Sequence, residues 1–221
     1  MLHWIGGILF GYCLCCDVFI GEYDNLCMEC GEQLKPYQED NCWCGKTPCD
    51  CHIPFFVAYE YNRMARRLLF QIKYNNNVAL MRFCAHKLSS FVIGKRVFVP
   101  IPTSRAKLFT RTYNQAVELS RYLAQYTDND FAPFVLKKTK LTTQAGKSKE
   151  ERYLNTESIL LDNYGEIINQ DIIIVDDLIA SGATITKAIE LLRPIAKSIQ
   201  VLAISRTYKN IPNEELDNYS S

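Results

Sequence analysis

The sequence predicts an α/β fold, with a mostly parallel β-sheet flanked by helices and a small cysteine-rich module before it. Two observations indicate this arrangement. Beyond residue 54, short apolar runs alternate with segments of helical periodicity, which is the pattern of βαβ units. Nine of the ten cysteines lie before residue 52, where aliphatic residues are few. With 221 residues, 48% of them hydrophobic and 22% charged, the chain has a globular composition and the length to bury a substantial core.

The first cysteine group has the spacing of a metal site. It reads C-x2-C-x10-C-x2-C and consists of Cys13, Cys16, Cys27 and Cys30. Two such turns each present two thiolates to a tetrahedral ion, so we expect zinc here. Cys15 is either spare or competes with Cys16 for its place. Because four thiolates leave no open position for a substrate, the zinc is expected to be structural.

The second cysteine group is a weaker metal signal. It reads C-x-C-x4-C-x-C and consists of Cys42, Cys44, Cys49 and Cys51. One residue between two cysteines chelates a single ion less readily than two residues do. The sequence therefore leaves open a second zinc ion, with His52 as a further candidate ligand, or free thiols. We interpret residues 1–53 as a zinc-binding module with one or two ions, in which the metal supplies much of the folding free energy.

The N-terminal residues do not have the features of a targeting segment. The stretch "MLHWIGGILFGYCLCC" lacks the basic region of a signal peptide, and it is too short and too interrupted by glycine to span a bilayer. We therefore expect a cytoplasmic protein with no membrane span. In that reducing compartment, clustered cysteines favour metal over disulfides.

Residues 54–208 are expected to form the second domain, followed by a flexible tail over 209–221. Its first helix, in "RMARRLLFQIKYNNN" from residue 63, is amphipathic and basic and ends at the Asn run. The other expected elements are, in order, a helix over 78–92, a strand in 96–102, a helix over 116–126, candidate strands over 134–140 and 157–161, a strand over 172–175, a helix over 184–193 and a strand over 198–205.

Charge is distributed unevenly, although the formal net charge is only +1. Residues 1–60 hold nine acidic and two basic side chains, whereas residues 61–153 hold eighteen Lys or Arg and five acidic residues. The middle of the chain is therefore where we expect an anion to bind.

The stretch "IIIVDDLIASGATITKAIELL", residues 172–192, carries the chemistry. An apolar β-branched run predicts a buried strand, and it ends at Asp176 and Asp177. Ligands of open α/β sheets bind beyond the carboxyl ends of the strands, so these acids should face a ligand there. The small residues that follow let the backbone approach an anion, Gly182 permits positive φ, and the next helix adds its first amides. Together these features predict a site for a phosphorylated sugar.

This stretch resembles the 5-phosphoribosyl-1-pyrophosphate (PRPP) signature of the type I phosphoribosyltransferases. The resemblance implies a phosphoribosyltransferase-like fold in which Asp176 and Asp177 bind the ribose hydroxyls. It also implies a loop that binds the 5′-phosphate, made of Ala180, Ser181, Gly182, Ala183 and Thr184. Ala180 departs from the pattern, because many members of the family carry Thr there. PRPP is bound and used with magnesium in this chemistry.

The remaining motifs resemble those of the ComF family of competence proteins, in the ComFC-like form. The resemblance rests on the cysteine-rich start followed by "LLFQIKY", "VPIPTSRAKLFTRTYNQA", "TTQAGKSKEERYLN" and the PRPP signature, in that order. It covers almost the whole chain. It implies a role in DNA uptake and natural transformation, with a competence helicase or another uptake protein as a candidate partner. The acceptor of the phosphoribosyl group is not revealed.

Cleavage of PRPP places negative charge on the leaving pyrophosphate, so catalysis should rest on positioning and charge stabilisation. The catalytic candidates are Asp176, Asp177, Arg105 and Arg111. Further substrate-binding candidates, all polar or basic, are Ser104, Lys107, Lys73, Lys147 and Arg152, the last two in a stretch that could close as a lid.

Two functions of different classes remain open. One is a transferase that uses PRPP. The other is a catalytically inactive adaptor that senses PRPP or binds single-stranded DNA, because the basic span 61–153 also contains aromatic residues, namely Phe70, Tyr74, Phe109 and Tyr113.

Overall fold

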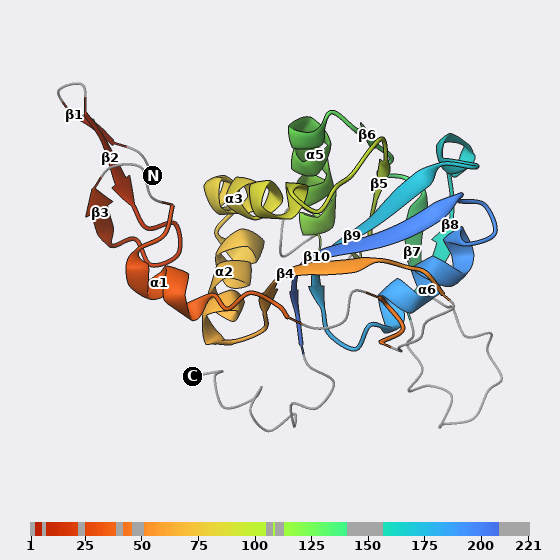
Figure 1. Cartoon of the computed structure of the whole chain (residues 1–221), viewed down its shortest axis with the longest axis horizontal. Helices are drawn as coiled ribbons and strands as arrows, with labels where there is room; N and C mark the ends of the chain where they lie inside the picture. Colours follow the sequence, from red (N-terminus) through yellow and green to blue (C-terminus); the bar gives the residue numbers. More distant parts are fainter. Residues whose placement is uncertain are drawn as a thin grey trace.

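A five-stranded parallel sheet with helices on both faces forms the body of the protein (Figure 1). The computed structural model describes residues 3–5, 8–21, 25–38, 42–45, 51–104, 108, 113–140 and 157–207. The predicted α/β fold with a parallel sheet is confirmed. The proposed tail, residues 209–221, lies outside the described residues. None of the described helices combines the length and apolarity that crossing a bilayer requires.

The strand order of the sheet is β4-β10-β9-β5-β6, and every neighbouring pair is parallel. The strands are β4 (Phe55–Glu60), β10 (Ser198–Arg206), β9 (Asp171–Ile179), β5 (Val97–Pro100) and β6 (Asp130–Phe131). The central strands β9 and β10 are rich in buried β-branched residues, as expected for strands covered on both faces.

Three helices pack on one face of the sheet: α2 (Arg63–Tyr74), α3 (Val78–Ser89) and α5 (Gln115–Thr127). The other face carries α6 (Ala183–Leu192), the 3₁₀ turn η2 (Gly165–Ile167) and an antiparallel hairpin of β7 (Leu136–Lys140) and β8 (Glu157–Leu161). Alternate residues of β9 supply both cores, because Ile173 belongs to the first and Ile172 to the second.

Asparagine begins each helix of the first face. Asn62, Asn77 and Asn114 each accept a hydrogen bond through the side-chain oxygen from a backbone N–H of the first turn of α2, α3 and α5. The Asn run thus both ends α2 and starts α3. The predicted helix over 78–92 is too long, since α3 ends at Ser89. The hydroxyls of Ser89 and Ser90 donate to the carbonyls of His86 and Lys87, which competes with continuation of the helix.

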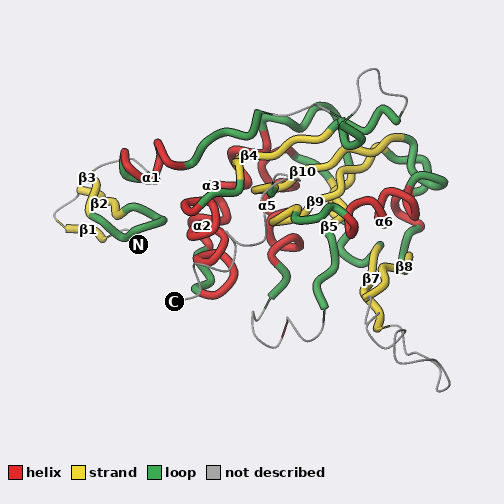
Figure 2. The backbone as a smooth tube through the Cα atoms, turned by 90° about the horizontal axis from the view of Figure 1, so that it is seen from below, coloured by secondary structure: helices red, strands yellow, loops and turns green. Residues whose placement is uncertain are grey.

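The described N-terminal residues as far as 33, which include the first cysteine group, lie at one end of the molecule, and hairpin β7–β8 lies at the other (Figures 1 and 2). The second cysteine group lies apart from the first, next to the start of α6. The module contains a three-stranded antiparallel sheet, β1 (His3–Ile5), β2 (Ile8–Tyr12) and β3 (Phe19–Gly21), and helix α1 (Met28–Gln33). The apolar N-terminal stretch left a short helix or a strand open, and the structure has strands there.

Two asparagine side chains join the module to α2 and α3. The Nδ2 atom of Asn62 donates to the carbonyl of Gln33 at 2.7 Å, and that of Asn77 donates to the carbonyl of Leu14 at 3.0 Å. The same asparagines that cap the two helices therefore also fix the module against them.

Candidate functional site

The site lies where β5 separates from β9. The two strands pair only as far as Pro100 opposite Val175, with one further hydrogen bond from Ile101 N to Val175 O at 2.8 Å. Proline at 100 and 102 removes backbone donors, which stops β5 there. The prediction that β9 ends at the two acids is wrong, because β9 continues beside β10 to Ile179. Beyond Val175, β9 has lost its neighbour on one edge, and a cavity of about 330 Å³ opens there.

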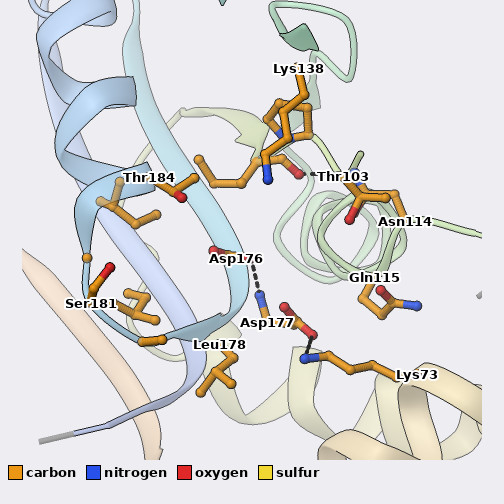
Figure 3. Close-up of a pocket in the computed structure, with 16 residues that line it drawn as sticks. Lys73, Thr103, Asn114, Gln115, Lys138, Asp176, Asp177, Leu178, Ser181 and Thr184 are labelled. Atoms are coloured by element: carbon orange, nitrogen blue, oxygen red, sulfur yellow. Dashed lines mark hydrogen bonds and ion pairs between the residues drawn. The ribbon is translucent and has the colours of Figure 1, made fainter. Parts of the chain in front are cut away.

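Asp176 and Asp177 both line this cavity, in different environments (Figure 3). Asp177 is only 9% exposed, whereas Asp176 is partly exposed. The Oδ1 atom of Asp176 accepts a hydrogen bond from the backbone N–H of Asp177 at 2.9 Å. Lys73, in the last turn of α2, places its Nζ 2.7 Å from Asp177 Oδ2, and both side chains are 13% exposed. The buried carboxylate is thus offset by a buried cation.

The contact with Lys73 is an ion pair without hydrogen-bond geometry. No described residue donates a hydrogen bond to Asp177 Oδ2, although this oxygen is buried. The charge of Lys73 is therefore what offsets this buried carboxylate oxygen.

Asp176 is the carboxyl group that resists ionisation. Removal of water from its surroundings, and then the negative charge of Asp177, raise the pKa of Asp176 well above its usual value. The Asp177 N–H and the charge of Lys73 act in the opposite direction and do not outweigh these effects.

The loop after β9 forms the opposite end of the cavity. Gly182 has φ of +78° and is the N-cap of α6. Apart from a long 3.4 Å bond from Ala183 N to Ser181 Oγ, no described side chain caps this helix. The first N–H groups of α6 are therefore available to an anion. Four of the five predicted loop residues line the cavity, namely Ala180, Ser181, Gly182 and Thr184, whereas Ala183 is exposed and does not.

The remaining wall includes polar residues that the sequence did not single out: Thr103, Asn114, Gln115 and Lys138. Asn114 caps α5 and also donates from Nδ2 to the carbonyl of Ile101 at 3.0 Å, which fixes the helix to the end of β5. An asparagine directly before a helical pattern could have signalled this cap. Lys138 reaches the cavity from β7, and only the pairing of the hairpin places it there.

One described residue among the predicted site residues, Ser104, does not line the cavity. Ser104 is 7% exposed and lies outside the lining, and its carbonyl accepts from Leu108 N at 3.1 Å. Five further candidates lie outside the described residues: Arg105, Lys107, Arg111, Lys147 and Arg152.

The first cysteine group could hold a metal ion. The sulfur atoms of Cys13, Cys16, Cys27 and Cys30 all lie within 4.8 Å of one another. Cys15 belongs elsewhere, because it is buried and its Sγ lies 3.3 Å from Met64 Sδ in the core. The choice left open by the sequence is therefore decided in favour of Cys16.

The backbone around Cys13 favours the ionised form of its thiol. Burial opposes ionisation, but hydrogen bonds from the backbone N–H groups of Cys27, Cys15 and Cys16 outweigh it and lower the pKa of Cys13 to about 7. Backbone donors that favour a thiolate are what a metal site of this kind requires.

The second cysteine group brings together three sulfur atoms. Those of Cys42, Cys44 and Cys51 lie within 4.8 Å of one another, with Cys42 and Cys51 at 3.1 Å. Cys49 lies outside the described residues. His52 is not a member of either cluster formed by the described residues. This group could also hold a metal ion.

Asp176 and Asp171, both on β9, are expected to affect the pH dependence of stability in opposite directions. The pKa of Asp176 is higher in the folded protein than in the unfolded chain, where it is about 3.9. The contribution of this carboxyl group to the free energy of unfolding is therefore fully present below about pH 3.9 and is lost as the pH rises through the folded-state pKa. Asp176→Asn should therefore unfold with a higher free energy than wild type at pH 8, and the difference should shrink toward pH 4. Urea unfolding of the ligand-free proteins at pH 4, 6 and 8 measures this.

Asp171→Asn is the matched control at the other end of the same strand. Hydrogen bonds from Ser198 and then Lys197 lower the pKa of Asp171 in the folded protein. The contribution of Asp171 to the free energy of unfolding is therefore present above its pKa in the unfolded chain and is lost as the pH falls through the folded-state pKa. This variant should be less stable than wild type at pH 8. Both variants share the cysteines of wild type, so thiol titration cancels in the differences. Differences of the same sign would contradict the environments described for the two carboxylates.

Comparison with known proteins identifies the domain that carries this cavity. A family model described as "Phosphoribosyl transferase domain" matches residues 84–215. The match begins inside α3 and includes β5, α5, β9, α6 and β10, whereas Lys73 and both cysteine groups precede it. No curated protein matches the chain.

Several solved structures, two of them adenine phosphoribosyltransferases, are similar at low identity. The allosteric regulatory enzyme of purine biosynthesis is 17% identical with a TM-score of 0.39, over 56% of this chain and 25% of that one. Adenine phosphoribosyltransferase of Thermoanaerobacter pseudethanolicus is 16% identical with a TM-score of 0.38, over 60% and 83%. Adenine phosphoribosyl transferase of Trypanosoma brucei, in complex with AMP, pyrophosphate and ribose-5-phosphate, is 11% identical with a TM-score of 0.42, over 76% and 91%.

These TM-scores lie below 0.5, so the structures add no weight to the assignment, which rests on the family model. That model matches more than half of the chain and contains both aspartates and the loop after them. The chain belongs to the phosphoribosyl transferase domain family.

Proposed function

We propose that the protein binds PRPP together with magnesium and transfers the phosphoribosyl group to an acceptor that is not yet identified. Membership of the family implies PRPP binding. The observation that carries the proposal is one cavity with two carboxylates on one wall and an uncapped helix start at its end. A ribose 5-phosphate unit has hydroxyl groups that can donate to the two carboxylates and a phosphate that can bind at the helix start.

Within this proposal, Asp176 and Asp177 accept hydrogen bonds from the ribose hydroxyls. The backbone of Ser181, Gly182 and Thr184 binds the 5′-phosphate. Lys73 neutralises Asp177 and so keeps the acid pair compatible with a ligand that carries several negative charges. Oxygen donors on this wall also suit magnesium, which the two aspartates would hold with PRPP and which supplies positive charge next to the pyrophosphate.

Catalysis would rest on cations near the leaving group. Lys73 and Lys138 are the lysines that the described cavity provides. Arg105 and Arg111 remain the proposed catalytic arginines, with Ser104 and Lys107 on the same loop. Lys147 and Arg152 remain candidates for a closing segment.

We further propose that the protein acts in DNA uptake as a ComF-like protein of the cytoplasm, with a helicase or other uptake protein as partner. The order of the motifs along the chain supports this. We assign one structural zinc ion to the first cysteine group and propose the second group as the place of a second ion where two are bound, with residues 1–53 as the module that this metal stabilises.

A second candidate function is supported by an exposed face of α2. Arg63, Arg67, Phe70 and Tyr74 follow one another at helical spacing, and all four are exposed. The rings of Phe70 and Tyr74 lie 4.9 Å apart. Aromatic rings beside basic side chains suit single-stranded nucleic acid. Tyr113 does not contribute, since it is partly buried and its hydroxyl donates to the carbonyl of Ile72, and Phe109 lies outside the described residues.

Removing both charges of the acid pair should abolish tight PRPP binding. In Asp176→Asn/Asp177→Asn, each charged hydrogen bond lost costs about 1.5–3 kcal/mol, a roughly tenfold to hundredfold weakening. Calorimetry with PRPP and magnesium measures this, with Asp171→Asn as the control that keeps wild-type affinity. Unchanged affinity in the double variant would defeat the site assignment.

Turnover separates the transferase from the inactive adaptor. Wild type incubated with PRPP, magnesium and a panel of amine and base acceptors should release pyrophosphate with at least one of them. Tight PRPP binding without release from any acceptor would favour the adaptor.

Metal content should distinguish two neighbouring cysteines. Protein purified without added metal should contain between one and two zinc ions per chain. Cys16→Ala should lose about one ion, because three thiolates hold zinc more weakly than four. Cys15→Ala is the matched control and should keep the metal, since Cys15 packs in the core. Wild type without zinc and with all thiols titratable would remove the assignment.

Binding of single-stranded DNA, if the second function holds, should depend on the two exposed rings of α2. Loss of stacking costs about 1–3 kcal/mol per base, so Phe70→Ala/Tyr74→Ala should bind at least about tenfold more weakly. Phe134→Ala, which removes a ring that is 70% exposed on the segment before β7, is the control. Wild-type affinity should fall steeply with salt. Equal binding by both variants would contradict a DNA site on α2.

A further inference from the structure

Trp43 connects the second cysteine group to the loop that follows β9. Its indole atoms Cη2 and Cζ2 lie 3.1 and 3.2 Å from the position that a Cβ atom would occupy on Gly182. Glycine is therefore required at 182 for two reasons, the positive φ and the indole packed against it. The contact joins residues far apart in the sequence, one between two cysteines and one at the start of α6.

The indole is held firmly on the side of the module. The backbone N–H of Trp43 donates to the carbonyl of Ile53 at 2.9 Å. Its neighbours Cys42 and Cys44 direct their sulfur atoms to one cluster with Cys51. A metal ion in this cluster would fix the backbone on both sides of Trp43.

The domain holds the same ring from the other side. The guanidinium of Arg206, at the end of β10, lies 5.4 Å from the centroid of the indole and 4.7 Å from that of Phe55. Phe55 also meets the indole edge to face at 5.5 Å. Trp43 is thus fixed against β4, β10 and the start of α6 together.

The loop itself has few other supports among the described residues. Thr207 Oγ1 donates to the carbonyl of Ala180 at 3.0 Å. Ala180 and Ser181 are exposed, and α6 has no strong side-chain cap. Backbone amides bind an anion well only when their orientation is set before the ligand arrives. The contact between Trp43 and Gly182 lies where it can fix the orientation of these loop amides.

We propose that Trp43 is a positioning residue for the phosphate-binding loop, and that metal bound by Cys42, Cys44 and Cys51 acts through Trp43 on the affinity for a sugar phosphate. This inference rests on the proposed function. It gives the second cysteine group a role in ligand binding in addition to a role in folding.

Ribose 5-phosphate is a suitable probe, because it carries the phosphate that the loop would bind and lacks the pyrophosphate. Trp43→Ala should bind it, and PRPP with magnesium, roughly tenfold or more weakly than wild type, since the loop amides lose their fixed orientation. Trp43→Phe should restore most of the affinity. Phe91→Ala, which removes a partly buried ring stacked on Phe56 at 4.9 Å on the other face of the sheet, should bind as wild type does.

The link to metal is tested by a double-mutant cycle. Cys44→Ala should lose metal from the second group and weaken ribose 5-phosphate binding to the same degree as Trp43→Ala. If the metal acts through the indole, adding Trp43→Ala to Cys44→Ala should weaken binding no further. Additive losses would overturn the link between metal and loop.

Hydrogen exchange of the ligand-free protein tests the role of Trp43 without any need for PRPP to bind. Amides 180–184 should exchange faster in Trp43→Ala than in wild type or in Phe91→Ala. A wild type that binds neither ligand would defeat the proposed function, and the exchange result alone would then decide the role of Trp43. Unchanged exchange of these amides in Trp43→Ala would overturn the inference.

Discussion

The ion pair between Lys73 and Asp177 allows a buried strand to carry two carboxylates into the cavity. Residues 172–175 are fully buried, and Asp177 follows them at 9% exposure, where an unpaired carboxylate would be costly. Lys73 can reach Asp177 only because α2 lies against the sheet with its last turn beside β9. The position of α2 is in turn fixed by its asparagine cap and by the module bound to that cap. The charge balance of the site therefore depends on helix packing well outside the cavity.

The cysteine-rich module contacts both structures that shape the site. Cys15, next in sequence to Cys16 of the first cysteine group, packs against Met64 of α2. The second group of the module places Trp43 against Gly182 at the start of α6. One contact supports the helix that supplies Lys73, and the other supports the loop for which phosphate binding is proposed. A module with no residue among those lining the described cavity is thus placed to influence both halves of it.

Local sequence signals predicted the parts of the site that follow one another along the chain. The β-branched run, the two acids and the glycine gave β9 and its loop, and the spacing of Cys13 and its partners gave the first cluster. Contacts between distant segments could not be predicted in this way. Lys73 was a candidate only as a base on an amphipathic helix, and Lys138 and Trp43 carried no signal of their own. The continuation of β9 to Ile179 depends on β10, which the residues of β9 do not specify.

The two carboxylates also differ in how they would meet a polyanion. Asp177 is neutralised by Lys73 at 2.7 Å, so the pair contributes little net charge to the cavity. Asp176 has a raised pKa and accepts a proton more readily than an ordinary aspartate. An acid pair at the mouth of a phosphate site would repel its ligand if both charges were fully expressed. In this arrangement the repulsion is reduced while both groups keep oxygen atoms that accept hydrogen bonds from hydroxyls. The fold therefore reconciles two carboxylates with a negatively charged ligand by placing a lysine behind one of them and limiting the hydration of the other.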